Sequence, residues 1–264
     1  MLKRCLSVCA AALVGSALHG APLTEAQVTK IINFVHVVDP AHGVHSAVIN
    51  EKIHDEIELK TGVKSRSELL FQDNTLTRVG PETSFSFKAG TRDLQLNQGS
   101  MLLQVPKGLG GAKIRTAAIT AAITGTTVMM KYTPRKEVKV LVLEGRLRLS
   151  VNALPGDSVL LTPGKMVVMP PGAKHIPQPV TVDLRRVMQS SSLVKMNGKG
   201  KGNLPSADLI ENEIAKQDQE LHSGRLTQSD FVNGYQSSVT GLRGLRATVE
   251  HPADDSDLGF SHHR

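Results

Sequence analysis

Turn-forming residues recur roughly every 8 to 14 positions along most of this 264-residue chain, so any regular element between them must be short. The segments between the turns alternate apolar and polar residues, as in Ser84-Phe85-Ser86-Phe87. This period of two is typical of β-strands, and many short strands at such spacing predict a sandwich, a barrel or a solenoid. We therefore expect a mainly β fold, a solenoid-like or sandwich stack of short strands, over residues 57–193. Residues 22–56 are expected to form an N-terminal strand or lead-in segment. The main turn signals are Gly62, Gly80-Pro81, Gly90, Gly99, Gly125, Gly145, Pro155-Gly156 and Pro163-Gly164.

Two stretches extend the β prediction through the middle of the chain. In residues 138–151, apolar and polar residues alternate on either side of Gly145, which predicts two strand segments with a bend or bulge between them. Residues 113–132 repeat the step Ala-Ala-Ile-Thr with a period of four, and their alanines would also suit a helix. Their threonine and isoleucine content, together with Gly125, favours strands.

The composition changes after Leu193. Residues 194–205 include Asn-Gly-Lys-Gly-Lys-Gly-Asn, which predicts a flexible linker. Residues 206–224 predict an amphipathic helix, with Ser206 as its N-cap and apolar residues at helical spacing. Residues 225–264 are expected to form a mostly flexible tail.

The first 21 residues have the pattern of an export signal. A basic start precedes a 13-residue apolar run from Leu6 to Leu18, which is shorter than the roughly 20 residues of a membrane-spanning helix. We expect a signal peptide over residues 1–21, and hence a periplasmic or secreted protein whose mature chain has no transmembrane span. A short buried helix or an uncleaved anchor is the alternative. Both cysteines, Cys5 and Cys9, lie in this segment.

Basic residues are concentrated in the middle of the chain. The net charge is −4 over residues 22–59, +9 over residues 60–150, +4 over residues 151–200 and −4 over residues 201–264. The basic segment predicts an interaction surface for an unknown protein or an anionic polymer of the cell envelope. Nucleic acid is not expected as a partner, because only 3% of the residues are aromatic and base-stacking platforms need aromatic side chains. The candidate surface residues are Arg78, Arg92, Arg115, Arg146 and Arg148.

Motifs of catalysis and metal binding are missing from the sequence. It contains neither Gly-x-Ser-x-Gly nor His-Glu-x-x-His. His42 and His45, with His36 and His54 nearby, have no supporting carboxylate spacing and are expected to be exposed rather than to bind a metal. Residues 107–113 are rich in glycine and lysine but lack the full phosphate-loop pattern. We therefore expect no enzyme activity, no cofactor and no metal; a carbohydrate-acting enzyme would need two carboxylates that face each other across a cleft.

An ordered series of short motifs runs through the β region. Residues 61–80 read Thr-Gly-x-x-Ser-Arg-Ser-Glu-Leu-x-Phe-x-Asp-x-Thr-x-x-Arg-x-Gly. Four further motifs follow: Leu-Asn-Gln-Gly at 96–99, Ile-Arg-Thr at 114–116, Ile-Thr-Gly-Thr at 123–126 and Val-Leu-Glu-Gly at 142–145. In this order they resemble the FecR-domain family, which occurs in the extracytoplasmic parts of iron-signalling regulators and in many secreted bacterial proteins. The resemblance covers about residues 57–170.

The resemblance implies a β-rich, solenoid-like domain outside the cytoplasm. In the signalling members a cytoplasmic anti-sigma segment and a transmembrane helix precede this domain, and neither is recognisable in the sequence. We therefore expect an exported, non-enzymatic FecR-domain protein that acts as an interaction or scaffold module of the envelope. The alternative is a periplasmic sensor or regulator in a cell-surface signalling system.

The motif residues are expected to serve the architecture rather than catalysis. The glycines allow a positive φ at tight strand connections, and Asp73 opens a turn. Arg66 and Glu68 share one strand face, where they can pair with charges on neighbouring strands. The full set is Gly62, Arg66, Glu68, Asp73, Gly80, Gly99, Gly125 and Gly145.

Overall fold

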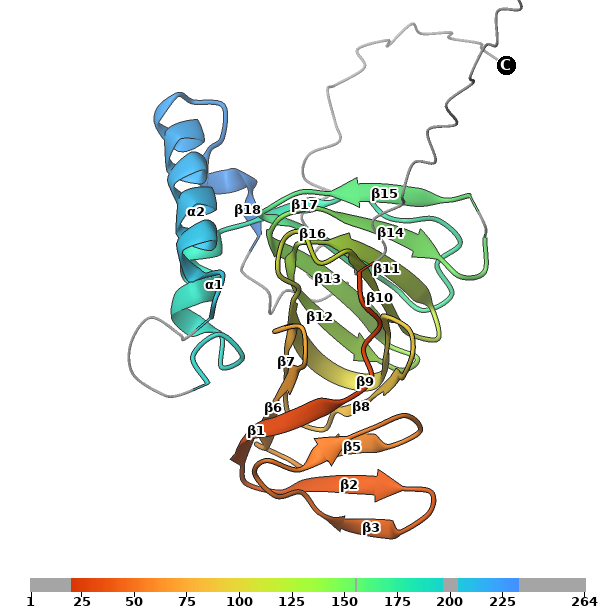
Figure 1. Ribbon diagram of the computed structural model, residues 1–264. Coiled ribbons are helices and arrows are strands. Elements are labelled where there is room, and N and C mark those ends of the chain that lie inside the picture. The colour runs from red at the N-terminus through yellow and green to blue at the C-terminus, as the bar shows by residue number, and fades with distance from the viewer. Residues whose placement is uncertain (1–19, 155, 197–203, 233–264) are drawn as a thin grey trace, which may run out of the picture.

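The computed structural model describes residues 20–154, 156–196 and 204–232, and this part of the chain is mainly β, as predicted (Figure 1). Nearly all of the predicted signal peptide, the glycine-rich part of the linker and the tail beyond Val232 lie outside the described residues. The 18 strands of the described part form one continuous, open, mixed sheet.

The strand β9 (Asp93–Gln104) divides this sheet into two layers. Its first half pairs with β8 and β10, and its second half pairs with β7 and β12. The layer that we call helix-covered contains, in order, β4 (Lys52–Ile53), β1 (Ala26–Ile32), β6 (Arg66–Phe71), β7 (Leu76–Val79), the second half of β9, β12 (Thr127–Thr133), β13 (Glu137–Glu144), β16 (Lys165–Met169), β17 (Val180–Val182) and β18 (Phe231–Val232). The uncovered layer contains β3 (Gly43–Ser46), β2 (Val35–Asp39), β5 (Glu58–Thr61), β8 (Ser84–Lys88), the first half of β9, β10 (Gly111–Arg115), β11 (Ile119–Thr124), β14 (Leu147–Val151) and β15 (Ser158–Leu161).

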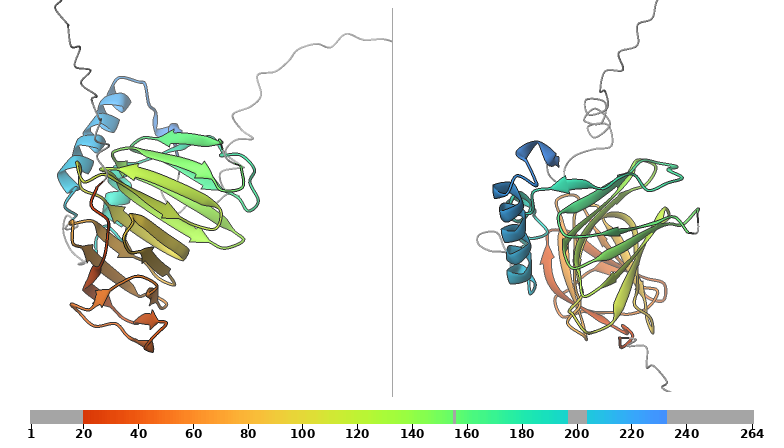
Figure 2. Two further views of the ribbon diagram at one scale, coloured as in Figure 1. Left: turned by 45° about the vertical axis from the view of Figure 1, so that its right-hand side comes forward. Right: turned by 90° about the horizontal axis from the view of Figure 1, so that it is seen from above.

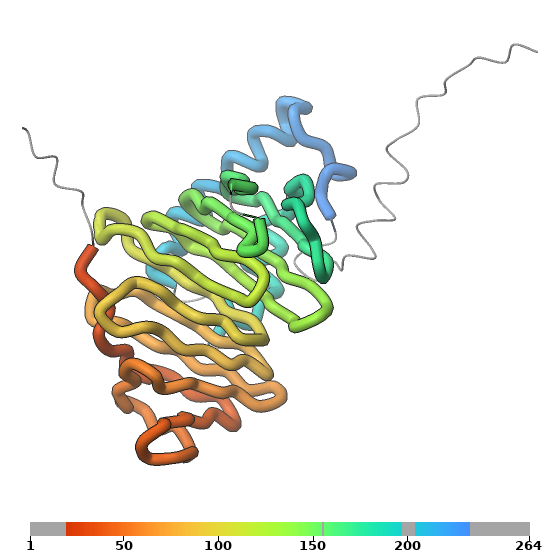
Figure 3. The backbone as a smooth tube through the Cα atoms, turned by 90° about the vertical axis from the view of Figure 1, so that its right-hand side faces the viewer, coloured from red at the N-terminus to blue at the C-terminus, as the bar shows by residue number. Residues whose placement is uncertain are grey.

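Apolar and polar side chains alternate along many of the strands, so each layer has an apolar inner face, and these two faces pack against each other. Inward side chains such as Leu59, Phe85 and Leu149 are at most 1% exposed and belong to one apolar core between the layers. Phe71 of the helix-covered layer meets Phe87 of the uncovered layer edge to face, with ring centroids 5.0 Å apart. Successive strands stack one above another from the β3 end to the β15 end, as Figure 3 shows.

The helices α1 (Leu184–Ser190) and α2 (Ala207–His222) pack on the outer face of the helix-covered layer (Figure 2). A second apolar core lies beneath them, in which Leu141 and Met166 of the strands contact a group that includes Ile210 and Ile214 of α2. Because this layer is buried on both faces, neither face of β13 carries exposed side chains, and nearly all residues of the strand are buried.

Several elements differ from the sequence-based expectation. Helix α1 lies inside residues 57–193, where only strands were predicted. Residues 22–56 contribute β1 to β4, of which β1 pairs with β6 and β2 pairs with β5 in the same layers. Residues 113–132 form strands, as predicted, with Gly125 in the turn between β11 and β12. Ser206 precedes α2 but makes no side-chain capping bond; its Oγ accepts a hydrogen bond from Thr127 Oγ1 at 2.7 Å.

The five motif glycines mark the corners at which the chain crosses from one layer to the other. Gly62 lies between β5 and β6, Gly80 between β7 and β8, Gly99 within β9, Gly125 between β11 and β12, and Gly145 between β13 and β14. A positive φ is present at Gly99, Gly125 and Gly145, but not at Gly62 or Gly80, so the expectation is wrong for these two. At Gly80 a Cβ would lie 2.2 Å from Ser100 Oγ, a hydroxyl that side-chain rotation can move, and 3.5 Å from the Ser100 backbone oxygen.

Candidate functional site

The five arginines that were predicted to form one basic surface have different environments. Arg148 is exposed on the outer side of β14, and Arg146 is exposed directly before this strand. Arg115 is partly exposed and pairs with Asp93 at 3.0 Å. The guanidinium of Arg92 pairs with Asp73 at 2.7 Å and is largely covered, with its side chain 9% exposed. Arg78 is 1% exposed.

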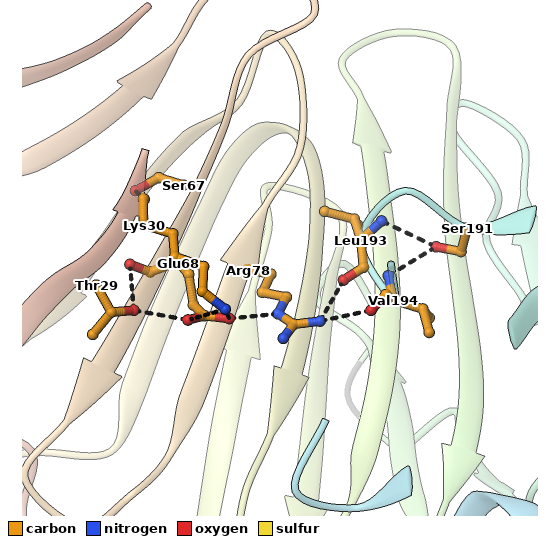
Figure 4. Close-up of polar contacts among 8 residues, drawn as sticks. All are labelled: Thr29, Lys30, Ser67, Glu68, Arg78, Ser191, Leu193 and Val194. Atoms are coloured by element: carbon orange, nitrogen blue, oxygen red, sulfur yellow. Dashed lines mark hydrogen bonds and ion pairs between the residues drawn. The ribbon is translucent and has the colours of Figure 1, made fainter. Parts of the chain in front are cut away.

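The interior position of Arg78 corrects the prediction that it belongs to an exposed surface. It lies on the outer side of β7, but the segment that follows α1 covers it (Figure 4). Its Nε is 2.7 Å from Glu68 Oε2, and its Nη1 donates to the carbonyl oxygens of Leu193 and Val194 at 3.0 and 2.8 Å. A buried guanidinium needs such charged and polar partners, because an unpaired charge in the interior is strongly unfavourable.

Glu68 on β6 is the centre of this polar cluster. Besides Arg78, it accepts a hydrogen bond from Thr29 Oγ1 at 2.9 Å and pairs with Lys30 Nζ at 3.3 Å. Burial is the largest single influence on the carboxyl group and opposes its ionisation. The hydrogen bond and charge of Arg78, with the contributions of Thr29 and Lys30, outweigh it and hold the pKa of Glu68 below its ordinary value. The carboxylate therefore stays ionised and fixes the guanidinium of Arg78.

The cluster joins the motif region to the C-terminal part of the chain. Ser191 Oγ accepts hydrogen bonds from the backbone N–H groups of Leu193 and Val194 at 3.3 and 3.4 Å, which shapes the turn that presents their carbonyls to Arg78. Glu68 and Arg78 of the 61–80 motif thus anchor the segment that follows α1 on the outer face of the helix-covered layer (Figure 4).

Asp73 and Arg66, the other two polar motif residues, have different surroundings. Asp73 Oδ1 accepts from the backbone N–H of Thr75 at 2.9 Å, the turn that was predicted, and Asp73 Oδ2 also pairs with Arg92. Arg66 Nε is buried without a hydrogen-bond partner in the described part of the chain, so the expected charge pairing at this position holds for Glu68 and not for Arg66.

A group of exposed cations remains on the uncovered layer, and we call Lys107, Lys113, Arg146 and Arg148 the basic strip. Lys113 of β10 and Arg148 of β14 are both opposite Ala122 of β11, so they flank a strand whose outward side chains are small. Lys107, Arg146 and Arg148 border a shallow surface groove of about 670 Å³ that passes over Ala122, Thr124, Gly125 and Gly145. The same two β11 residues also border a second groove, which Lys113 lines.

The cations of the basic strip differ in how far they are neutralised. Lys107 Nζ lies 2.9 Å from Glu144, whose side chain is buried. Arg148 donates to Ser158 Oγ at 3.2 Å, and within the described residues the guanidinium of Arg146 has no hydrogen-bond or ion-pair partner. Guanidinium groups bind carboxylates and phosphates through two parallel hydrogen bonds, so the strip is suited to an extended acidic ligand. The sequence analysis predicted Arg146 and Arg148 as surface residues. It included Lys107 and Lys113 only as the ends of a segment rich in glycine and lysine.

The described residues offer little for metal binding. No group of three or more His, Cys, Asp or Glu side chains there is arranged to hold a metal ion. His42 and His45 instead form pairs with Asp39 and Glu51, each at 2.7 Å. Among the helices of the described segments, none has the length and apolar character that crossing a membrane requires.

Comparisons with known proteins agree with the motif series. The family model described as "FecR protein" matches residues 57–148. No curated protein matches the chain significantly. Two crystal structures, each described as a candidate anti-sigma factor from Parabacteroides distasonis ATCC 8503, are similar with identities of 15% and 16% and TM-scores of 0.44 and 0.43. In both cases the match covers 49% of this chain and 62% of the other.

Proposed function

From the match of residues 57–148 to the family model described as "FecR protein", we propose that the protein is an exported, non-enzymatic interaction module of the cell envelope. The signal-like pattern of residues 1–21 supports export. The stacked layers with glycine corners support a solenoid-like scaffold, whose rigid uncovered layer presents side chains to a partner.

The basic strip is the observation that carries this proposal. It places four cations around the strand β11, whose outward residues Thr120, Ala122 and Thr124 are small. An extended acidic chain can approach such a surface closely and contact cations on both sides of the strand. We therefore propose an anionic envelope polymer, or an acidic segment of an envelope protein, as the partner.

The test measures binding of fluorescently labelled poly-L-glutamate and inorganic polyphosphate to the purified protein at several NaCl concentrations. The wild-type protein should bind both probes, and its affinity should fall as salt screens the contacts. The double variant Arg146→Glu/Arg148→Glu should weaken binding at least about tenfold, which corresponds to about 1.4 kcal/mol.

A matched control changes the net charge equally at a distant place. Arg135 and Lys136 are exposed in the turn between β12 and β13, at the end of these strands away from Gly125 and Gly145. The variant Arg135→Glu/Lys136→Glu should keep most of the wild-type affinity. Equal losses in both double variants, or no binding by the wild-type protein, would refute a specific role of the basic strip.

The second candidate function is regulation, as a periplasmic sensor that passes a signal to a membrane partner. The family assignment supports it, and the anchoring of the C-terminal segment by Arg78 supplies a contact that a partner could displace. Co-purification of a membrane-bound anti-sigma protein or transporter from cells that express the protein would favour this function over that of a passive scaffold.

A further inference from the structure

The most exposed apolar side chains gather at the two ends of the stack. Within the described residues nine large apolar side chains are at least 36% exposed, and five of them, all 50% exposed or more, lie in residues 34–63. Two others lie next to or in β15, at the opposite end, and the remaining two, Leu109 and Leu209, are the least exposed. Grouped apolar surface of this kind marks interaction sites. The five are Phe34, Val44, Val48, Ile49 and Val63, and the two are Leu154 and Leu160.

These ends coincide with the two edges of the uncovered layer. Among the described residues β3 pairs only with β2, and β15 pairs only with β14 (Figure 1). Each edge strand is four residues long and leaves backbone N–H and C=O groups without a strand partner. Protected edges usually carry lysine, proline or a bulge. Neither Gly43–Ser46 nor Ser158–Leu161 contains lysine or proline, and both pairings are regular.

The exposed side chains of the two edges lie on the same face of the layer. Val37 on β2 is buried in the core between the layers, so Val38 and its cross-strand partner Val44 point outward. Leu161 on β15 is buried in the same core, so Leu160 also points outward, beside Arg148. If the layer of one molecule continued into that of another, Val44 and Leu160 would therefore meet on one face.

The charges of the two ends are opposite. Residues 36–58, around β3, contain five acidic residues and one lysine, a net charge of −4. Residues 145–176, around β15, contain four basic residues and one acidic residue, a net charge of +3. Contact between unlike ends brings opposite charges together, whereas β3 with β3, or β15 with β15, would bring like charges together.

We propose that copies of this chain associate head to tail, with β3 of one molecule pairing with β15 of the next, so that the uncovered layer continues from molecule to molecule. Such a contact is heterologous: it leaves one free β3 edge and one free β15 edge, and it generates rows that grow with protein concentration. The proposal does not depend on the binding of an acidic polymer.

The test measures the weight-average mass by light scattering coupled to size-exclusion chromatography, over a range of concentrations up to about 100 µM, at which an interface of micromolar affinity would be saturated. The wild-type protein should grow in mass with concentration. Val44→Lys and Leu160→Lys each place a cation on one exposed edge position, and each should weaken association at least about tenfold. Leu209→Lys, an exposed apolar position on α2, should behave as wild type.

Mixing the two edge variants distinguishes a head-to-tail contact from a symmetric one. Val44→Lys keeps an intact β15 edge, and Leu160→Lys keeps an intact β3 edge. At concentrations at which each variant alone is monomeric, an equimolar mixture should therefore form heterodimers that do not grow further. The proposal is overturned if the wild type is monomeric throughout, if only one of the two variants loses association, or if their mixture stays monomeric.

Discussion

At the scale of single residues, the pair of Arg78 and Glu68 shows how a charged motif serves packing. Both side chains are almost fully buried, and they are joined at 2.7 Å. Arg78 also satisfies two backbone carbonyls of the segment that covers it. Lysine could not reproduce this geometry, because Nε bonds the carboxylate and Nη1 bonds the two carbonyl groups, whereas a lysine side chain has only one nitrogen atom.

Arg78→Met should lower the free energy of unfolding by about 3 to 5 kcal/mol, because it leaves the Glu68 carboxylate and two carbonyl groups buried without their partner. Denaturant titration followed by circular dichroism measures this change. Arg148→Met, at an exposed position, should stay within about 0.5 kcal/mol of wild type. The double variant Glu68→Met/Arg78→Met should recover part of the loss, because no lone charge is then buried. A loss below about 1 kcal/mol in Arg78→Met would show that the pair does not anchor the segment.

At the scale of elements, the corners determine how successive strands stack. At Gly145 the chain leaves β13 in the helix-covered layer and enters β14 in the uncovered layer, with φ +85°. A Cβ on Gly145 would lie 2.6 Å from the carbonyl oxygen of Gly125, the neighbouring corner. Glycine is therefore required here for two reasons, its backbone conformation and the closeness of the next corner.

Gly145→Ala should destabilise the protein by more than the roughly 1 to 2 kcal/mol that a positive φ alone costs an alanine. Gly90→Ala is the matched control, because Gly90 has φ +74° but no atom within 4 Å of a Cβ there. Thermal and denaturant unfolding of the two variants would measure the difference. If both variants lose the same stability, the close approach of the corners contributes nothing.

At the scale of the whole molecule, the strands of the helix-covered layer contribute side chains to two apolar cores. Its strands bury one face against the uncovered layer and the other against the helices. Leu141 and Val142, adjacent on β13, point into different cores. Loss of either core therefore weakens strands that the other core needs, and we expect the described region to unfold as one cooperative unit.

Ile214→Glu places a carboxylate in the core beneath α2, where Ile214 is 3% exposed. It should lower the free energy of unfolding by about 3 kcal/mol or more, and calorimetry should show a single transition at a lower temperature. Leu209→Glu, on the exposed side of the same helix, should change stability by less than about 0.5 kcal/mol. Two separate transitions in Ile214→Glu would contradict cooperative unfolding of the two cores.

The sequence by itself determined the elements whose signals are local. The period of two and the regular glycines predicted the strands and their turns, including residues 113–132, because alternation and turn chemistry act between near neighbours. The motif series also predicted a resemblance to the FecR family, and the model of that family matches residues 57–148. The exposed position of Arg148 follows from the same alternation in β14.

Only the tertiary structure decided which charges are exposed. Arg78 and Arg146 are equally basic in the sequence, but the segment after α1 covers the first and leaves the second in solvent. The covering residues are 115 and 116 positions away in the chain, and no local pattern predicts a contact over that separation. The same reason applies to α1, the second core and the basic strip, because each depends on which strands and helices become neighbours when the chain folds back on itself.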